Sequence, residues 1–471
     1  MKKAGIAAVV LVTLAAAGSA GAWYTGTQLE GVLRTNIEQG NQQLSTQFPD
    51  TDLALEMVGF ERGIFSSKAR YRVLLKEGSA ADSPLDLFIT DHIEHGPVPL
   101  SRLVTFKWLP VMALSHAQLE PNEWLTGLFA SSAGRPPVTL DSSIGYGKGI
   151  AGKLEVAPLK WGDAKGQSAA FSGLSAVYET DTAGDSFKLD ARVDSVELKG
   201  PPGVYGFTVN MVGWDVNLNR KRDMSGLYLG SSRGEVDQFS VEVAGMPPLL
   251  LNEVVQSDLV TLNGDGANLG LNYRIGSVNY GADRLGSMDL GLNLSRIDPQ
   301  SVLELVGLSN SLLFGNVSEG QTEQFEAAIE QLLGGHPRVS LDNLSIRTAN
   351  GESRLNLGMD LARPASMNAA PEVLLPELIS TLDAKLVLSK PMLMDLVRHR
   401  ALFDPTVDKA VVEQEAALAA EMTGAMAEML QLGRVEGDNI VSQLSYANGA
   451  IIFNGQAVEL EELMGLMAGM Q

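Results

Sequence analysis

The glycine-rich run Gly147-Lys148-Gly149-Ile150-Ala151-Gly152 has the spacing of a dinucleotide-binding fingerprint, and its extension to Lys153 matches all but the last position of a phosphate-binding P-loop. A P-loop needs Ser or Thr after its lysine to reach magnesium, and Leu154 stands there. Both motifs also lead into a helix, whereas residues 153–159 alternate like a strand and contain Pro158. The run is therefore interpreted as a glycine-rich turn.

The segment from Gly230 to Gly234 matches the nucleophile-elbow pattern of hydrolases, with Ser232 at the position of the nucleophile. An elbow requires a turn from a strand into a helix, because that turn exposes the serine. Here the residues on both sides have the character of strands. The pattern predicts a hairpin turn and no catalytic serine.

The segment from Asp91 to Pro97 is the densest cluster of metal-ligating and acid-base side chains, and it holds two of the five histidines. Its spacing does not fit a zinc-binding helix, and Gly96-Pro97 would end a helix at once. On a strand, His92 and Glu94 share one face and His95 points to the other, so a single ion would need distant ligands. We expect a strand end whose polar side chains hydrogen-bond the turn from Gly96 to Pro99. No catalytic, cofactor-binding or metal-binding residue is assigned, and the chain is not expected to be an enzyme.

The elements around these segments are mostly strands. Strand-like runs separated by Gly, Asp, Asn and Ser occupy 153–161, 170–179, 187–198, 207–218, 235–243, 268–279 and 287–294. Strands that follow one another without intervening helices form antiparallel sheet, and runs of this length favour an extended, curved sheet. The predicted fold class is mainly β with helical insertions (α+β), preceded by one N-terminal transmembrane helix.

Helical spacing returns at four places. It is found from Thr27 to Leu44, in the pair Pro299 to Phe314 and Glu319 to Leu333, in a long acidic segment from Thr406 to Leu432, and over Leu460 to Met467. Short helices are also expected within Ser101 to Leu119 and Asn122 to Ala130, and Asn448-Gly449 predicts a type I′ hairpin turn. The resulting regions are a membrane anchor (1–26), an N-terminal helix with a mixed α/β region (27–136), a β-rich region (137–298), a helical insertion (299–337), and C-terminal strands with the acidic helix and terminal hairpin (338–471).

The N-terminus indicates export. Lys2 and Lys3 precede an uncharged run from Ala4 to Tyr24, which is about the length that crosses a hydrocarbon core of roughly 30 Å. The lysines are expected at the cytoplasmic face, and Trp23 and Tyr24 at the opposite membrane interface. This places a single-pass anchor in the inner membrane and the remaining chain in the periplasm. The alternative is a cleaved signal peptide, because Ala20-Gly21-Ala22 fits the small-residue cleavage pattern.

Charge and composition exclude some partners. A formal charge of −21 argues against nucleic acid, since binding a phosphate backbone draws on clustered Lys and Arg. The absence of cysteine excludes disulfides and thiolate metal sites.

The long acidic helix has one apolar face that could contact a partner. That face comprises Val411, Leu418, Met422, Met426 and Met429. A bare apolar stripe in water invites association, so we expect it to be buried against the sheet or against a second copy of the chain.

Several segments together resemble the YdgA-like family of Gram-negative inner-membrane proteins, whose molecular function is unknown. The marks of this resemblance are Gly21 to Gly26 (GAWYTG), Arg62 to Ser67 (RGIFSS), His95 to Leu100 (HGPVPL), Leu382 to Leu386 (LDAKL), Tyr446 to Gly449 (YANG) and Asn454-Gly455. The resemblance implies an uncleaved anchor, a periplasmic body and self-association. It implies no activity, because the family offers no catalytic residues to carry over.

These observations predict a non-enzymatic scaffold or binding protein in envelope or surface-structure assembly, without a cofactor. Its expected partners are the inner membrane, a second copy, and an envelope protein or a lipid. The alternative is lipid or hydrophobic-ligand binding or transfer in a groove of the long sheet. A continuous apolar surface on the sheet would favour the alternative, and a filled core with polar outer surfaces would favour the scaffold.

Overall fold

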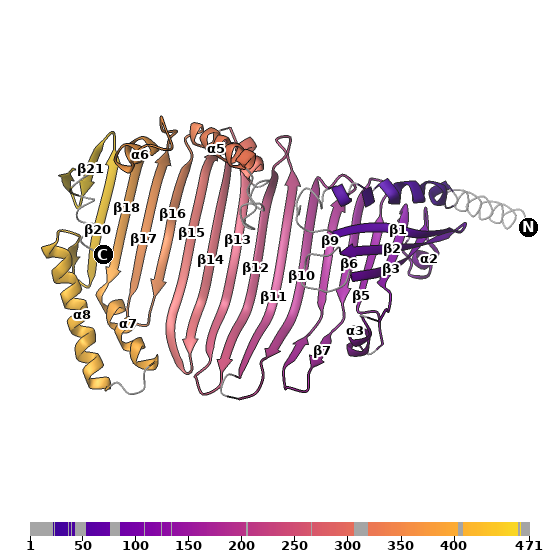
Figure 1. Cartoon of the computed structure of the whole chain (residues 1–471), viewed down its shortest axis with the longest axis horizontal. Coiled ribbons are helices and arrows are strands. Elements are labelled where there is room, and N and C mark those ends of the chain that lie inside the picture. The colour runs from indigo at the N-terminus through magenta and orange to yellow at the C-terminus, as the bar shows by residue number, and fades with distance from the viewer. Residues whose placement is uncertain are drawn as a thin grey trace, which may run out of the picture. The chain divides into compact units, whose positions relative to one another are not determined.

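The computed structural model describes residues 22–42 apart from 23, 36 and 39; 53–75; 85–305 apart from 108, 124, 133, 204, 205 and 265; 319–403; 408–459; and 462. These residues form mainly antiparallel β-sheet with helical insertions, as predicted (Figure 1). The chain divides into two compact units, residues 1–197 with 215–221 (unit 1) and 198–214 with 222–471 (unit 2). The boundary falls inside the predicted β-rich region, because strand patterns do not reveal which strands share contacts. The division into five regions remains a prediction.

Unit 1 contains an antiparallel sheet in which neighbouring strands pair in the order β1-β2-β3-β4-β5-β6-β9-β10. The strands are β1 (Leu53–Arg62), β2 (Ser66–Leu75), β3 (Leu85–His95), β4 (Ala113–Leu119), β5 (Val138–Ile144), β6 (Gly149–Val156), β9 (Leu174–Asp181) and β10 (Ser186–Lys199). A hairpin of β7 (Leu159–Gly162) and β8 (Ser168–Phe171) and two short helices, α2 (Leu100–Val104) and α3 (Thr126–Ser131), complete it.

The N-terminal helical segment 22–42 covers the first strands of this sheet. Leu29, Leu33 and Ile37 recur at helical spacing and pack against a core that includes Ala69 and Ile93. Further along the helix, the Asn41 side chain donates to the Leu55 carbonyl at 2.9 Å and accepts from the Leu55 N–H at 3.0 Å. Asn41 thus satisfies backbone groups of β1 as a neighbouring strand would.

Unit 2 contains an antiparallel sheet whose strands pair in the order β12-β13-β14-β15-β16-β17-β18-β20-β21-β22. The strands are β12 (Tyr228–Val243), β13 (Leu249–Asn263), β14 (Gly266–Tyr280), β15 (Asp283–Ile297), β16 (Arg338–Arg347), β17 (Glu352–Leu361), β18 (Ile379–Ser389), β20 (Asn439–Ala447), β21 (Ala450–Phe453) and β22 (Gln456–Val458), with β19 (Arg434–Glu436) also on β20. Residues of β11 (Phe207–Arg222) belong to both units.

Four labelled helices accompany the sheet of unit 2. They are α5 (Glu319–Gly334), α6 (Pro371–Leu378), α7 (Lys390–Phe403) and α8 (Lys409–Met429). Residues 299–305 are also helical, which agrees with the start of the predicted pair, and the rest of that first helix lies outside the described residues. Most of the helix expected over Leu460 to Met467 lies outside them as well.

The terminal hairpin forms as predicted. Asn448 and Gly449 have φ of 52° and 79°, which are the two positive values that a type I′ turn requires. The short helices expected within Ser101 to Leu119 and Asn122 to Ala130 are found as α2 and α3, and strand β4 follows Pro110 in the first of these segments. Strand β13 and helix α7 were not predicted from the sequence.

Candidate functional site

The three segments that suggested chemistry are structural. Gly145 to Lys148 form the turn between β5 and β6, and strand β6 begins at Gly149. The glycine-rich turn predicted for Gly147 to Gly152 is therefore confirmed only at its first two residues, and a strand, not a phosphate-binding helix, follows it. The hairpin predicted at Gly230 to Gly234 is wrong, because β12 runs straight through this segment. Ser232 lies opposite Asp258 of β13 and donates a hydrogen bond to its carboxylate. The two glycines suggested a turn, but Gly230 pairs with Val260 and Gly234 with Gln256 of β13, so the strand continues through both.

The Asp91 to His95 segment forms the end of β3, with the alternation that was predicted. His95 is 2% exposed, its Nε2 lies 2.8 Å from the Ser67 hydroxyl, and its Nδ1 lies 3.2 Å from the Ile64 carbonyl. Glu94 accepts from the backbone N–H and the hydroxyl of Ser101, both at 3.0 Å. Ser67 lies in β2, Ile64 in the turn before it and Ser101 in α2. The prediction that these side chains bond the turn from Gly96 to Pro99 is therefore wrong for His95 and Glu94.

His95 serves as a buried anchor between β3 and the N-terminal helical segment. A Cβ atom added at Gly26 would lie 2.5 Å from Cε1 of His95, so this glycine allows the close approach of helix and imidazole. Burial lowers the pKa of His95, and the charge of Arg62 adds to that effect, while the carbonyl contacts of Ile64 and Ala22 oppose it. The neutral ring then donates through Nδ1 to Ile64 and accepts through Nε2 from Ser67.

We expect unit 1 to lose stability as the pH falls below about 6.5. The folded His95 has a pKa below its ordinary value of 6.5, so the unfolded chain binds the proton first and its population rises with acidity. Replacing His95 with Asn should flatten this dependence by up to about 1.4 kcal/mol per pH unit between pH 6.5 and 5. Denaturant unfolding over this range measures the slope. The matched control is His92→Asn on the opposite, exposed face of β3, and equal slopes in both variants would contradict the assignment.

The described residues contain no cluster of three or more His, Cys, Asp or Glu that could hold a metal ion. The strongest candidate for a functional surface is instead one face of the sheet in unit 2. Residues directly opposite each other on paired strands share a face, so the strand register reveals what each face presents.

Three rows of apolar side chains run side by side across this sheet. The first row contains Leu269, Leu294, Val339, Met359, Leu382, Tyr446 and Ile451; the second contains Leu271, Leu292, Leu341, Leu357, Ala384, Leu444 and Phe453; the third contains Tyr273, Leu290, Leu344, Leu355 and Leu386. We call these three rows the apolar face. None of their members carries a charge.

The opposite face of the same strands is polar. Paired positions across it include Gly270, Asn293, Ser340, Gly358, Asp383 and Ser445. A shallow hollow of about 580 Å³ lies on this side, and its lining mixes Arg338 and Lys385 with Asp342 and Asp383. The hollow shows no excess of either charge that would select an ionic ligand.

In a two-layer protein the apolar face of a sheet is covered by a second layer and forms the core. Here the apolar face is only half-buried. Among the side chains of its three rows, Ile451 alone is buried, and Tyr273 is 42% exposed. The buried cluster of unit 2 gathers at one end of the strands, where Leu262, Ala267 and Ile297 meet the helical residues 299–305 and α5. Among the residues that the structure describes, no helix packs over the middle of the three rows, so the face remains a large partly exposed apolar surface.

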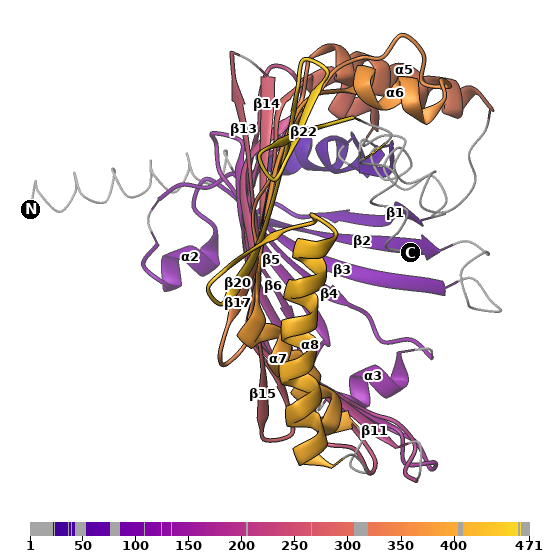
Figure 2. The same ribbon diagram turned by 90° about the vertical axis from the view of Figure 1, so that its left-hand side faces the viewer.

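Helices border the apolar face at both ends of the strands. Leu294 of the first row packs in the same cluster as Leu332 of α5, and the Tyr446 hydroxyl lies 3.4 Å from the Pro376 carbonyl of α6. At the other end, the Tyr280 ring stacks on Phe403 of α7 with centroids 4.6 Å apart. Figure 2 shows α5 and α6 near one end of the strands and α7 and α8 near the other, on the same side of the sheet.

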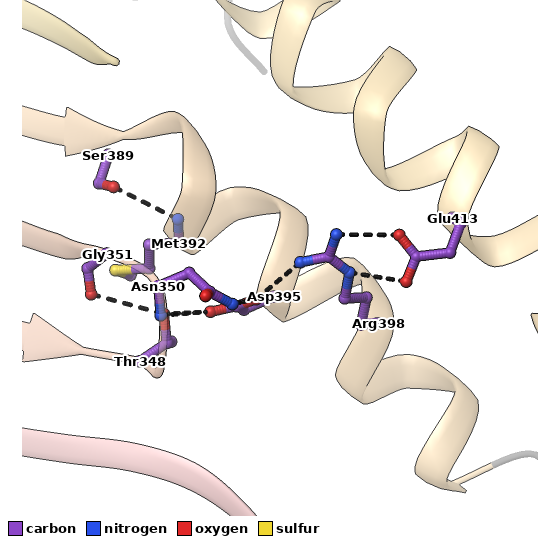
Figure 3. A network of polar contacts seen from close by, with 8 residues as sticks. All are labelled: Thr348, Asn350, Gly351, Ser389, Met392, Asp395, Arg398 and Glu413. Atoms are coloured by element: carbon purple, nitrogen blue, oxygen red, sulfur yellow. Dashed lines mark hydrogen bonds and ion pairs between the residues drawn. The ribbon is translucent and has the colours of Figure 1, made fainter.

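Helix α7 is held in place by the buried carboxylate of Asp395 (Figure 3). Asp395 accepts from the Thr348 hydroxyl at 2.7 Å, from the backbone and side chain of Asn350 at 3.0 and 2.8 Å, and from Arg398 at 2.9 Å. Burial alone raises the pKa of Asp395, but these hydrogen bonds outweigh it and hold the pKa below its ordinary value. Arg398 continues the network to Glu413 of α8 with bonds of 2.8 and 2.9 Å. The β16–β17 loop, α7 and α8 are thereby joined.

The apolar residues predicted on the acidic helix lie on the exposed side of α8. Val411, Leu418, Met422, Met426 and Met429 are all exposed, whereas Val412, Ala416 and Ala420 form the buried side. Burial of the predicted face against the sheet is therefore wrong, and its burial against a second copy stays a prediction. The small residues pack because they let α8 approach its neighbours closely.

Three of the four predicted membrane-interface residues lie outside the described residues. Lys2, Lys3 and Trp23 lie outside the described residues, and Tyr24 is exposed at the start of the N-terminal helical segment. A search of the described helices finds none that is both long and apolar enough to span a bilayer.

A family model described as "Bacterial protein of unknown function (DUF945)" matches residues 1–461, and the chain belongs to this family. Protein YdgA of Escherichia coli K12 is 29% identical over 503 aligned residues, which cover 99% of this chain and 97% of that protein. The uncharacterized protein YihF of the same organism is 23% identical, with 97% of each chain covered. An uncharacterized protein of Haemophilus influenzae is 21% identical over 65% of this chain and 86% of its own length. The YdgA-like resemblance is confirmed, and no solved structure matches the chain.

Proposed function

We propose that this protein is an envelope lipid-binding protein that holds acyl chains on the apolar face of unit 2. In this proposal the run from Ala4 to Tyr24 anchors the chain in the inner membrane and the two units lie in the periplasm. The observation that carries the proposal is the register of the three rows, which places mostly aliphatic side chains together on one face over five strands in the third row and seven in the other two. The sequence had left this function as the alternative to a protein scaffold.

The dimensions of the apolar face suit acyl chains. From β14 to β21 the second row crosses six gaps between strands, which at about 4.8 Å each makes roughly 29 Å. The three rows extend about 14 Å along the strands, since alternate residues on a strand are about 6.8 Å apart. One leaflet of a bilayer has a hydrocarbon thickness of about 15 Å, which is half of the ~30 Å core. The face can therefore hold the chains of one lipid either along or across the strands.

The chemistry of the apolar face favours lipid over a protein partner. Its members are mostly leucines, with Tyr273, Tyr446 and Phe453 as the aromatic exceptions. Protein interfaces are enriched in aromatic and Arg anchors with hydrogen bonds to a polar rim, whereas acyl chains need only continuous apolar contact. No hydrogen-bonding pattern within the three rows would specify the sequence of a peptide.

Photolabelling in cells tests the proposal. Cells that incorporate a photoactivatable fatty acid into their lipids are irradiated, and labelled peptides of the full chain are mapped by mass spectrometry. We expect label on peptides of β14 to β18 in addition to any label near the N-terminus. Label confined to residues 1–42 would contradict lipid binding by unit 2 while leaving membrane contact by the N-terminus intact.

A further inference from the structure

Helix α8 has two different faces, and only one of them packs against other parts of the chain. Val412, Ala416 and Ala420 are 4%, 0% and 2% exposed, and they recur every four residues along the buried side. On the other side Leu418 is 60% and Met429 is 73% exposed. The exposed stripe of Val411, Leu418, Met422, Met426 and Met429 lies nearly opposite the buried side on a helix of 3.6 residues per turn.

Most of the carboxylates on α8 form ion pairs with basic side chains of α7. Glu413 is paired with Arg398, and Glu421 lies 3.2 Å from Lys390. Glu415 lies 3.5 Å from Arg400. Three of the helix's acidic side chains are thus matched by basic side chains of α7. Self-association through the stripe would bring together surfaces whose charges are already largely balanced.

The order of residues in the stripe is complementary to itself in an antiparallel arrangement. If two copies of α8 pair about a two-fold axis at the level of Ala420 along the helix, Val411 of each copy faces Met429 of the other and Leu418 faces Met422, while Met426 faces Gln414. Glu415 then faces Ala425, so no like charges oppose one another. A parallel pair would place Glu415 against Glu415. The spacing of seven residues from Val411 to Leu418 and from Met422 to Met429 is that of a two-helix seam.

We propose that α8 is the contact between two copies of this chain, which pair their exposed stripes antiparallel with the two-fold axis midway between Leu418 and Met422. The stripe from Val411 to Met429 is about 27 Å long, so the contact extends over roughly five turns of the helix. A membrane surface fits less well, because the chain carries a net charge of −21 and Lys409 is the only Lys or Arg within α8. This inference does not rest on lipid binding by the apolar face.

Cysteine crosslinking of the full chain in cells tests both the contact and its direction. The natural chain has no cysteine, so every disulfide comes from the introduced residues. One tagged copy carries Leu418→Cys and a differently tagged copy carries Met422→Cys. We expect a disulfide between the two tags, and the same for Val411→Cys with Met429→Cys, because these pairs come within bonding distance only in the antiparallel arrangement. Ala417→Cys is the control, since Ala417 is exposed but lies off the stripe.

Three results would overturn the proposal. One is crosslinking of Leu418→Cys to itself more strongly than to Met422→Cys, which indicates a parallel pair. Another is crosslinking no stronger than that of Ala417→Cys at any stripe position. The third concerns Leu418→Lys, which should reduce the Val411-to-Met429 crosslink at least tenfold without changing the melting temperature, because Leu418 is mostly exposed within one chain. An unchanged crosslink in that variant contradicts the proposed contact.

Discussion

Replacing Leu292 and Leu341 together with Asp is expected to reduce photolabelling of unit 2 by lipid more than tenfold. The two leucines are directly paired on β15 and β16 in the second row of the apolar face, and both are half-buried. Covering a half-exposed leucine with an acyl chain contributes about 1 kcal/mol, and an unpaired carboxylate beneath that chain adds a desolvation cost. A loss of about 2 kcal/mol or more exceeds the 1.4 kcal/mol that corresponds to a factor of ten.

Label near the N-terminus of the same variant serves as an internal control for the label on unit 2. Label near the N-terminus should persist, because the substitutions lie only in unit 2. A matched control replaces Asn293 and Ser340 with Asp, since this pair is adjacent on the same two strands but belongs to the polar face. We expect the control to keep the label on β14 to β18. Equal loss in both variants would show that folding, and not the apolar face, is what the substitutions disturb.

Replacing Asp395 with Ala is expected to lower the free energy of unfolding by about 1.5 to 3 kcal/mol, the range for removing a charged partner from buried hydrogen bonds. Asp395 is 4% exposed, and its removal leaves the Asn350 N–H without this acceptor and the Thr348 hydroxyl with only the Gly351 carbonyl at 3.4 Å. Denaturant unfolding measures this change. The control is Glu413→Gln on the exposed end of the same network, which should cost less than about 1 kcal/mol. A comparable loss in both variants would refute the anchoring role of Asp395.

The pH dependence of this effect has a defined direction. The folded Asp395 has a pKa below its ordinary value of 3.8, so its contribution is fully present above that pH and is lost as the pH falls further. The difference in stability between the natural chain and Asp395→Ala should therefore shrink in strong acid. A constant difference down to pH 2 would mean that the carboxylate is not the source of the stabilisation.

The sequence predicted the β-rich class because alternation is a local signal. Leu290, Leu292 and Leu294 alternate with small and polar residues, which is the pattern of a strand with one apolar face. The pattern could not show that Leu292 pairs with Leu341, because the helical insertion separates β15 from β16 in the sequence. Continuity of the apolar face depends on such pairings and required the structure.

Other features were hidden for different reasons. Asp395 binds Thr348 and Asn350, which lie 47 and 45 positions away in sequence, and nothing near Asp395 indicates these two partners. On α8 the Met-rich face was visible, but hydrophobicity alone pointed to the wrong buried side. Ala416 and Ala420 are weakly hydrophobic, and they are buried because their small size permits close packing. At β12, glycines at positions 230 and 234 suggested a turn that the strand pairing overrides.

The central claim is that the apolar face holds acyl chains, and one photo-crosslinking comparison tests it most directly. A photoreactive amino acid is placed at Leu292 in one full-length variant and at Asn293 in another, and the cells are irradiated. These neighbours on β15 point to opposite faces of the sheet. The account predicts a lipid adduct on the intact protein at position 292 and none at position 293. Equal adducts at both positions, or a protein adduct without lipid at 292, would contradict it.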